Sequence, residues 1–233
     1  MKPLVRAFAA LAVAAALLAG SQLFLPPLVE KQIEAGIARS FGDVKFVRAD
    51  VRAVPALMLL GGRLDAINLD VRRAALGDLT IDAILLDGRN LKVDTASLVT
   101  GRGVRIRSAD ALLATFVIAE DDLNHYFWRQ VNDSQFFRVA LERGEAVLAG
   151  RVNLLGRGLD VTVRGAFQVD GATTVTFLPR DVRVENTRLP QFLVDMIVQE
   201  WTIALELDQE AIPLEITDLL VEDGKLLIYG RGA

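Results

Sequence analysis

Residues 67–72, Ile-Asn-Leu-Asp-Val-Arg, alternate between apolar and polar side chains, and this period of two constrains the fold more than any other sequence feature. Such a segment is typical of a strand with one buried face and one wet face, which favours antiparallel sheet. Further strand candidates cover residues 44–53, 79–86, 90–94, 104–107, 112–118, 137–141, 146–148, 152–155, 159–163, 167–169, 175–177, 182–184, 214–221 and 226–229. Turns are expected at Gly144, Gly150, Gly156, Gly158 and Gly171.

Three segments have helical periodicity instead. The first is predicted to open at Pro26-Pro27 and to end at Gly42, with charged residues such as Glu30 and Glu34 off its apolar stripe. The second begins near Glu120, and the third follows Pro190. Because helices and runs of strands are not strictly alternated, the order predicts one α+β domain with a long, mostly antiparallel sheet. The apolar stripes are Val29, Ile33, Ile37 and Phe41; Leu123, Phe127 and Val131; and Phe192, Leu193, Met196, Ile197 and Trp201.

The first residues have the pattern of a targeting segment. Lys2 and Arg6 precede the apolar run 7–20, and small residues at Ala19 and Ser21 suit a cleavage site. The alternative is an uncleaved anchor, because the apolar stretch is just long enough to span a membrane. We therefore expect residues 1–25 to be a signal peptide or N-terminal membrane anchor, and residues 26–233 to form a single exported domain. Its expected place is the outer face of the cytoplasmic membrane or the periplasm.

Composition excludes several classes of function. The chain has no cysteine, which rules out thiol catalysis, disulfides and cysteine zinc sites. The formal net charge of −4 comes without a basic block, which argues against nucleic-acid binding. No motif indicates a cofactor.

Candidate catalytic groups are few. His125 is the single histidine, and on a helix it would share a side with Asp121 and Asp122, as a metal site or acid–base pair requires. The alternative is an exposed helix residue beside first-turn carboxylates, which the helix dipole favours. There is no Gly-x-Ser-x-Gly elbow and no phosphate-binding loop. The sequence therefore predicts a protein that is not an enzyme and holds no metal.

Two clusters bear on lipid. Arg105 and Arg107, with Arg102 just before them, are candidates for a phosphate headgroup, because guanidinium matches phosphate geometry. The alternative is a solvated strand face. The run Leu57 to Leu60 is either an exposed tip that touches a membrane or a segment buried against the first helix.

The sequence resembles the LmeA-like phospholipid-binding family of bacterial envelopes. The resemblance rests on residues 64–69, 118–124, 188–193, 212–216 and 224–226, and it covers nearly all of the exported part. It implies a strongly curved sheet wrapped around amphipathic helices, similar to tubular lipid-binding domains. It also implies phospholipid binding and a supporting role in the assembly of envelope lipoglycans or the cell wall.

On this basis the expected function is to bind, and to hold or transfer, phospholipid in an apolar groove. The expected partners are phospholipid, a membrane surface or the N-terminal anchor, and an envelope enzyme. The alternative is a non-lipid scaffold that stabilises such an enzyme, because the same apolar pattern also describes a filled core. The candidate lining residues are Leu69, Val71, Phe127, Val161, Val163, Phe167, Leu193 and Ile197.

Overall fold

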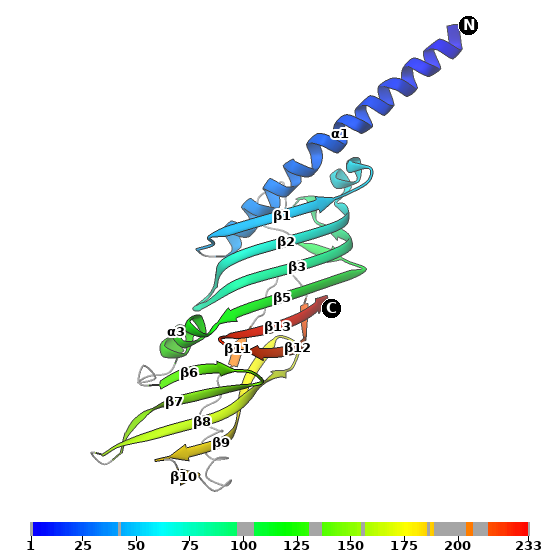
Figure 1. Cartoon of the computed structure of the whole chain (residues 1–233). Coiled ribbons are helices and arrows are strands. Elements are labelled where there is room, and N and C mark those ends of the chain that lie inside the picture. The colour runs from blue at the N-terminus through cyan, green and yellow to red at the C-terminus, as the bar shows by residue number, and fades with distance from the viewer. Residues whose placement is uncertain are drawn as a thin grey trace.

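The computed structural model describes residues 2–41, 43–96, 105–130, 137–154, 157–185, 187–188, 204–206 and 214–232. The molecule is elongated: a long helix projects from one end, and two antiparallel sheets follow one another along the axis (Figure 1). This confirms the prediction of mostly antiparallel sheet with a few helices. The strands form two sheets rather than the single long sheet that was expected.

The first sheet is seven-stranded, in the order β1-β2-β3-β5-β13-β12, with β4 paired to β3. The last two strands of the chain therefore return to the sheet that its first strands built, and β13 pairs antiparallel with β5. The strands are β1 (Phe46–Arg52), β2 (Arg63–Leu76), β3 (Leu79–Val93), β4 (Ile106–Ser108), β5 (Ala111–Ala119), β12 (Leu214–Glu222) and β13 (Lys225–Gly232). The short 3-10 helix η1 (Ala56–Gly61) connects β1 to β2.

The second sheet is six-stranded, in the order β10-β9-β8-β7-β6, with β11 paired to β9. Its strands are β6 (Phe137–Glu142), β7 (Glu145–Leu154), β8 (Arg157–Asp170), β9 (Thr174–Val184), β10 (Thr187–Arg188) and β11 (Ala204–Glu206). Backbone hydrogen bonds join it to the last hairpin of the first sheet. The N–H of Gly144 donates to the carbonyl of Val221 at 3.0 Å, and that of Gly224 donates to Leu141 at 2.9 Å.

Several strands are longer than predicted, because glycines inside them were taken for turns. Gly150 lies within β7 and Gly158 within β8, so both predicted turns are wrong, whereas Gly144 and Gly171 do occupy turns with positive φ. Gly156 lies outside the described residues. Gly165 lies at a bulge of β8, where an added Cβ would collide with the carbonyl of Leu178. Glycine here permits close backbone approach rather than chain reversal.

Helix α1 (Lys2–Ser40) is continuous over 39 residues and contains both Pro26 and Pro27, so the predicted start at this pair is wrong. On both sides of the prolines, polar side chains of the helix bond to the backbone of β1 or of the segment that follows it. Before them, Gln22 donates to the carbonyl of Ala53 and accepts from the N–H of Ala56. These contacts attach the helix to the body next to Pro26 and Pro27, which have no backbone N–H to donate.

The edge of β1 is covered by carboxylates of α1. The backbone N–H of Val51 donates to Glu30 at 3.0 Å, and that of Ala49 donates to Glu34 at 3.1 Å. Four helix residues rise about 6 Å, and two strand residues about 6.7 Å, so successive helix turns meet successive outward N–H groups. The sequence placed both glutamates off the apolar stripe, but it did not indicate that they bind a strand.

Side chains of helix α3 (Glu120–Gln130) cover the edge of β6 in the same way. Glu120 accepts the N–H of Leu141 at 2.8 Å. Asn124 accepts the N–H of Val139 at 2.7 Å and donates to its carbonyl at 2.8 Å. The indole of Trp128 donates to the next alternate carbonyl of β6. The predicted start of this helix at Glu120 is confirmed, and its four-residue spacing again matches alternate strand residues.

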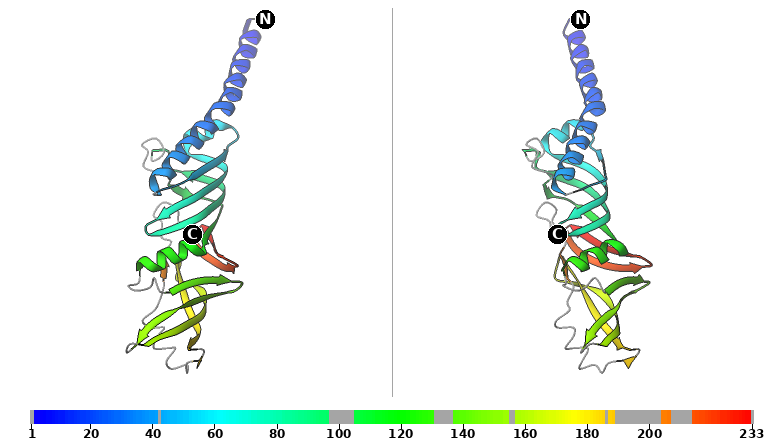
Figure 2. Two further views of the ribbon diagram at one scale, coloured as in Figure 1. Left: turned by 60° about the vertical axis from the view of Figure 1, so that its left-hand side comes forward. Right: turned by 90° about the vertical axis from the view of Figure 1, so that its left-hand side faces the viewer.

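The apolar stripes of both helices join one core with the inner faces of the sheets. Ile33 and Ile37 of α1 are buried, as are Leu123 and Phe127 of α3. The views in Figure 2 show α1 lying along the first sheet and α3 lying between the two sheets. Val131 and the predicted helix after Pro190 lie outside the described residues.

Candidate functional site

The predicted lining residues lie in or against the common apolar core. Leu69 and Val71 of β2, Val163 of β8 and Phe127 of α3 are buried, with no exposed surface at Val71 and 3% at Val163. Val161 and Phe167 of β8 are partly buried and pack against the same core. Leu193 and Ile197 lie outside the described residues. The shared core explains the burial of these side chains, but none of them is thereby assigned to a ligand.

Beneath α3 the side chains that the structure describes leave little free space. A hollow between the helix and the second sheet measures about 10 Å³, which is room for one water molecule at most. Phe167 and Phe177 help to fill it, with ring centroids 5.6 Å apart. An acyl chain does not fit between these side chains. The lining residues of this hollow are Leu123, Phe127, Val139, Ala146, Leu148, Phe167 and Phe177.

A larger apolar groove lies between α1 and η1 and measures about 320 Å³. Its size and its mostly apolar lining with few polar groups are typical of small-molecule pockets. Leu59 is buried, whereas Leu60 and Leu28 are largely exposed. The groove is lined by Leu25, Leu28, Val29, Gln32, Leu59, Leu60 and Thr95.

The structure divides the Leu57–Leu60 run between buried and exposed side chains, and contact of the exposed ones with a membrane stays a prediction. Leu59 is buried against the core, as the burial interpretation requires, whereas Leu57 and Leu60 are exposed, as the tip interpretation requires. Gly62 ends η1 in the left-handed conformation at φ 72°. An added Cβ at this glycine would collide with the carbonyl of Val93, so the close approach of η1 to β3 needs glycine there.

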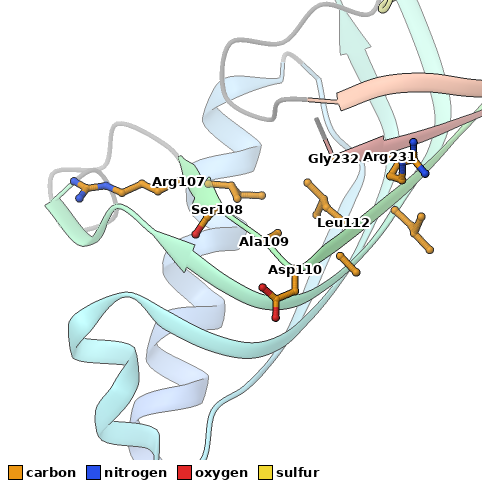
Figure 3. Close-up of a pocket in the computed structure, with 10 residues that line it drawn as sticks. Arg107, Ser108, Ala109, Asp110, Leu112, Arg231 and Gly232 are labelled. Atoms are coloured by element: carbon orange, nitrogen blue, oxygen red, sulfur yellow. The ribbon is translucent and has the colours of Figure 1, made fainter.

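A second pocket, of about 230 Å³, lies beside β4 and the ends of β5 and β13 (Figure 3). Arg107 and Arg231 line it from different strands, and Leu112 supplies an apolar wall. Arg107 pairs with Asp94 at 3.2 Å and remains mostly exposed. Arg231 has no ion pair with any residue that the structure describes. Asp110 also lines the pocket, and in Figure 3 the guanidinium of Arg107 points away from Leu112, so the lining mixes charges of both signs with apolar groups.

The two pockets are linked through two consecutive residues. Thr95 lines the apolar groove, and its neighbour Asp94 holds the guanidinium of Arg107. The backbone N–H of Asp94 also donates to the carbonyl of Arg105 at 2.9 Å. Of the predicted headgroup residues, Arg105 and Arg107 therefore lie near this junction, and Arg102 lies outside the described residues.

Several residues of these pockets were not predicted. Leu25, Leu28, Val29 and Gln32 follow the i, i+3, i+4, i+7 spacing of one helix face, and this signal was present in the sequence. Val29 was predicted as part of the apolar stripe, whereas Leu25 lies before the expected helix start at Pro26, so the four residues were not predicted as one face. No sequence pattern pointed to Arg231, since its position beside the pocket depends on the antiparallel pairing of β13 with β5, which sets it opposite Leu113.

The candidate acid–base pair on α3 is not formed. His125 is exposed, and its Nδ1 contacts the main-chain carbonyl of Asp121 at 2.7 Å instead of a carboxylate. Asp122 is paired with Arg73 at 2.8 Å. Burial raises the pKa of Asp122 above its ordinary value, and Arg73 acts in the opposite direction. Within the described ranges, no three His, Asp or Glu side chains are grouped as a metal site requires.

Comparison with known proteins assigns the family. Residues 20–231 match the LmeA-like phospholipid-binding family, from the middle of α1 to the end of β13. The chain belongs to the LmeA-like phospholipid-binding family. Neither the curated proteins nor the solved structures contain a match. Membership in the LmeA-like family confirms the resemblance and supports phospholipid binding, and the matched region contains both pockets.

Within the residues that the structure describes, no helix is long and apolar enough to cross a bilayer.

Proposed function

We propose that the protein is an exported, non-enzymatic carrier that holds a phospholipid at the cell envelope and passes it on. The observation that carries this is the apolar groove of about 320 Å³ between α1 and η1, in a chain of the LmeA-like family. Acyl methylenes would occupy the groove, where each contributes about 0.8 kcal/mol on burial. The phosphate would lie toward Arg107, which Asp94 holds beside Thr95 of the groove.

Export is proposed on the sequence of the first residues. Lys2 and Arg6 precede the apolar run 7–20, which favours translocation of everything that follows. A reporter that is active only outside the cytoplasm, fused after Ala233, should be active. Activity of a reporter that works only inside the cytoplasm would contradict this part of the proposal.

One observation favours the second candidate, a scaffold that binds an envelope enzyme without lipid. The described side chains beneath α3 leave little free space, and exposed leucines such as Leu57 and Leu60 offer an apolar contact surface. A scaffold would use this surface for a protein partner and would carry no lipid.

Native mass spectrometry of the freshly purified full chain separates the two candidates. The carrier should retain phospholipid, and filling the groove by Leu28→Trp together with Leu59→Trp should lower the amount retained per chain. Leu220→Trp, at an exposed leucine of β12 outside the groove, is the matched control and should retain the parent's amount. A folded parent chain without any lipid would favour the scaffold.

A further inference from the structure

Exposed apolar side chains gather at the end of the body from which α1 projects. Their exposed fractions run from 44% at Leu57 to 73% at Leu23 and Val54. They come from α1, from the β1–η1 connection and from η1, which lie together in Figure 1. Single exposed leucines are ordinary, but a cluster from three segments indicates a contact surface. We define the tip as Leu23, Phe24, Leu28, Val54, Leu57 and Leu60.

Hydrogen bonds, and a groove lined by both α1 and η1, show that α1, the β1–η1 connection and η1 are neighbours. Gln22, which precedes Leu23, bonds to the backbone of Ala53 and Ala56, on either side of Val54. Leu28 and Leu60 line the same groove from α1 and η1. The groove therefore opens within the tip, and a surface that contacts the tip also covers the mouth of the groove.

Basic side chains surround the tip at the ends of the strands. Arg63 begins β2 one residue beyond the η1 C-cap, Lys92 is near the end of β3, and Arg105 precedes β4. All three are exposed, and none has an ion-pair partner among the residues that the structure describes. In a chain of net charge −4, this is a local excess of positive charge.

The strand register places two of these positive charges opposite each other. Arg63 and Lys92 are direct cross-strand partners in β2 and β3, and like charges placed opposite each other destabilise a sheet. Of the nearby carboxylates, Asp94 pairs with Arg107, while Asp65 accepts the N–H of Val54 at 2.7 Å and keeps its charge, so the basic side chains still outnumber the acidic ones. An anion that approaches this end from outside would relieve the repulsion between Arg63 and Lys92.

We propose that the tip docks on an anionic phospholipid bilayer. Phe24, Leu57 and Leu60 enter the acyl region, while Arg63, Lys92 and Arg105 meet the phosphates of the surrounding lipids. Apolar insertion combined with basic side chains is the general requirement for binding at a membrane surface. This inference deepens the proposed function, since it names the surface through which phospholipid would reach the groove.

A fluorescent label at the tip tests the docking directly. The chain has no cysteine, so Leu60→Cys gives one labelling site for an environment-sensitive dye in the full chain. With vesicles of phosphatidylglycerol and phosphatidylcholine, the emission should shift to the blue and be quenched by brominated acyl chains. Leu220→Cys, an exposed leucine on β12 remote from the tip, is the matched control and should show neither effect.

The basic side chains are tested with the same label. We expect the partition constant of the chain between water and vesicles to fall by roughly 10- to 100-fold in the triple variant Arg63→Gln, Lys92→Gln and Arg105→Gln, since each basic residue near an anionic surface contributes to binding. Added salt and pure phosphatidylcholine vesicles should weaken insertion of the parent for the same reason. Arg143→Gln, Arg180→Gln and Lys225→Gln, at exposed positions elsewhere, should leave it within about threefold.

The outcomes separate this inference from the proposed function. If the label stays in water while the chain sits on the vesicle, the N-terminal segment alone holds the chain there and the docking proposal is wrong. A blue shift without vesicles that grows with protein concentration would mean that a second copy covers the tip, which also overturns it. Lipid retention by native mass spectrometry is independent, because a docking-deficient chain can still carry phospholipid.

Discussion

The carboxylate of Glu30 accepts the backbone N–H of Val51 at 3.0 Å, so a helix side chain takes the place of a neighbouring strand. Glu34 does the same for Ala49. Replacing both glutamates by alanine should lower the free energy of unfolding by about 1.5–3 kcal/mol for each lost bond to a charged acceptor. Urea unfolding monitored by circular dichroism measures this. The control Lys31→Ala, at an exposed position between them, should change stability by less than about 0.5 kcal/mol, and an equal loss there would contradict the edge interpretation.

Asn124 carries the corresponding role on α3 and is 2% exposed. Asn124→Leu keeps the approximate volume but leaves both backbone groups of Val139 without a partner. We expect a loss of about 2–4 kcal/mol in unfolding free energy, since each buried unsatisfied group costs about 1–3 kcal/mol. Hydrogen exchange should show faster exchange at the amide of Val139. Unchanged exchange at this amide would mean that Asn124 does not close the edge of β6.

Val71→Trp and Val163→Trp test whether the interior is filled, as the burial of both side chains indicates. Overpacking a filled core costs about 1–3 kcal/mol, so both variants should lose stability without losing lipid relative to the parent. Leu85→Trp, on the outer face of β3, is the control for tryptophan itself. Little loss of stability together with a loss of bound phospholipid would place the acyl chains at these strands instead of in the α1–η1 groove.

Asp122 should contribute a pH-dependent stability term. Burial raises the pKa of its carboxyl in the folded state, so the folded chain binds this proton more readily than the unfolded chain. The stabilising contribution is present below the ordinary carboxyl pKa of about 3.9 and is lost as the pH rises through the raised folded value. Relative to Asp122→Asn, the parent should therefore become less stable across this interval. Chemical unfolding at several pH values, with Asp121→Asn as the exposed control, measures the difference; a constant difference would contradict it.

His125→Gln should leave phospholipid retention and stability near the parent's, within about 0.5 kcal/mol for an exposed position. The imidazole contacts a main-chain carbonyl and lies edge-on to Trp128 with ring centroids 5.4 Å apart, and neither contact joins it to a carboxylate. A variant that stays folded but loses function would instead direct attention to chemistry at α3.

Local sequence patterns predicted the elements well, and long-range geometry less well. The period-two run of residues 67–72 and the helix beginning at Glu120 were both confirmed. The prediction at Pro26 was wrong because local rules put proline at a helix start, whereas α1 runs through both prolines and contacts the body on either side of them, through Gln22 and Glu30. Gly165 supports a close backbone contact that exists only once β9 has paired with β8.

In the candidate site, too, residue types could be predicted from the sequence but their spatial relations could not. The arginines near β4 were singled out by residue type, but their relation to the groove depends on Asp94 and Thr95, which no local pattern connects to α1. The cross-strand pair of Arg63 and Lys92 follows from register, which a single sequence does not specify here.

The covered edges have a further consequence for how copies of this chain behave toward one another. An outward N–H on β1 or β6 that already donates to a helix side chain is not free to pair with a strand of another molecule. Pairing between exposed strand edges is the usual first step of sheet polymerisation. The rise of four helix residues falls short of two strand residues by just under 1 Å. This difference in rise adds up with each further helix turn, so the helix caps the edge strand without presenting a row of backbone groups to which another strand could pair. We therefore expect loss of Glu30 and Glu34 to expose a nucleation edge, and fibrils rather than amorphous precipitate to form from that variant.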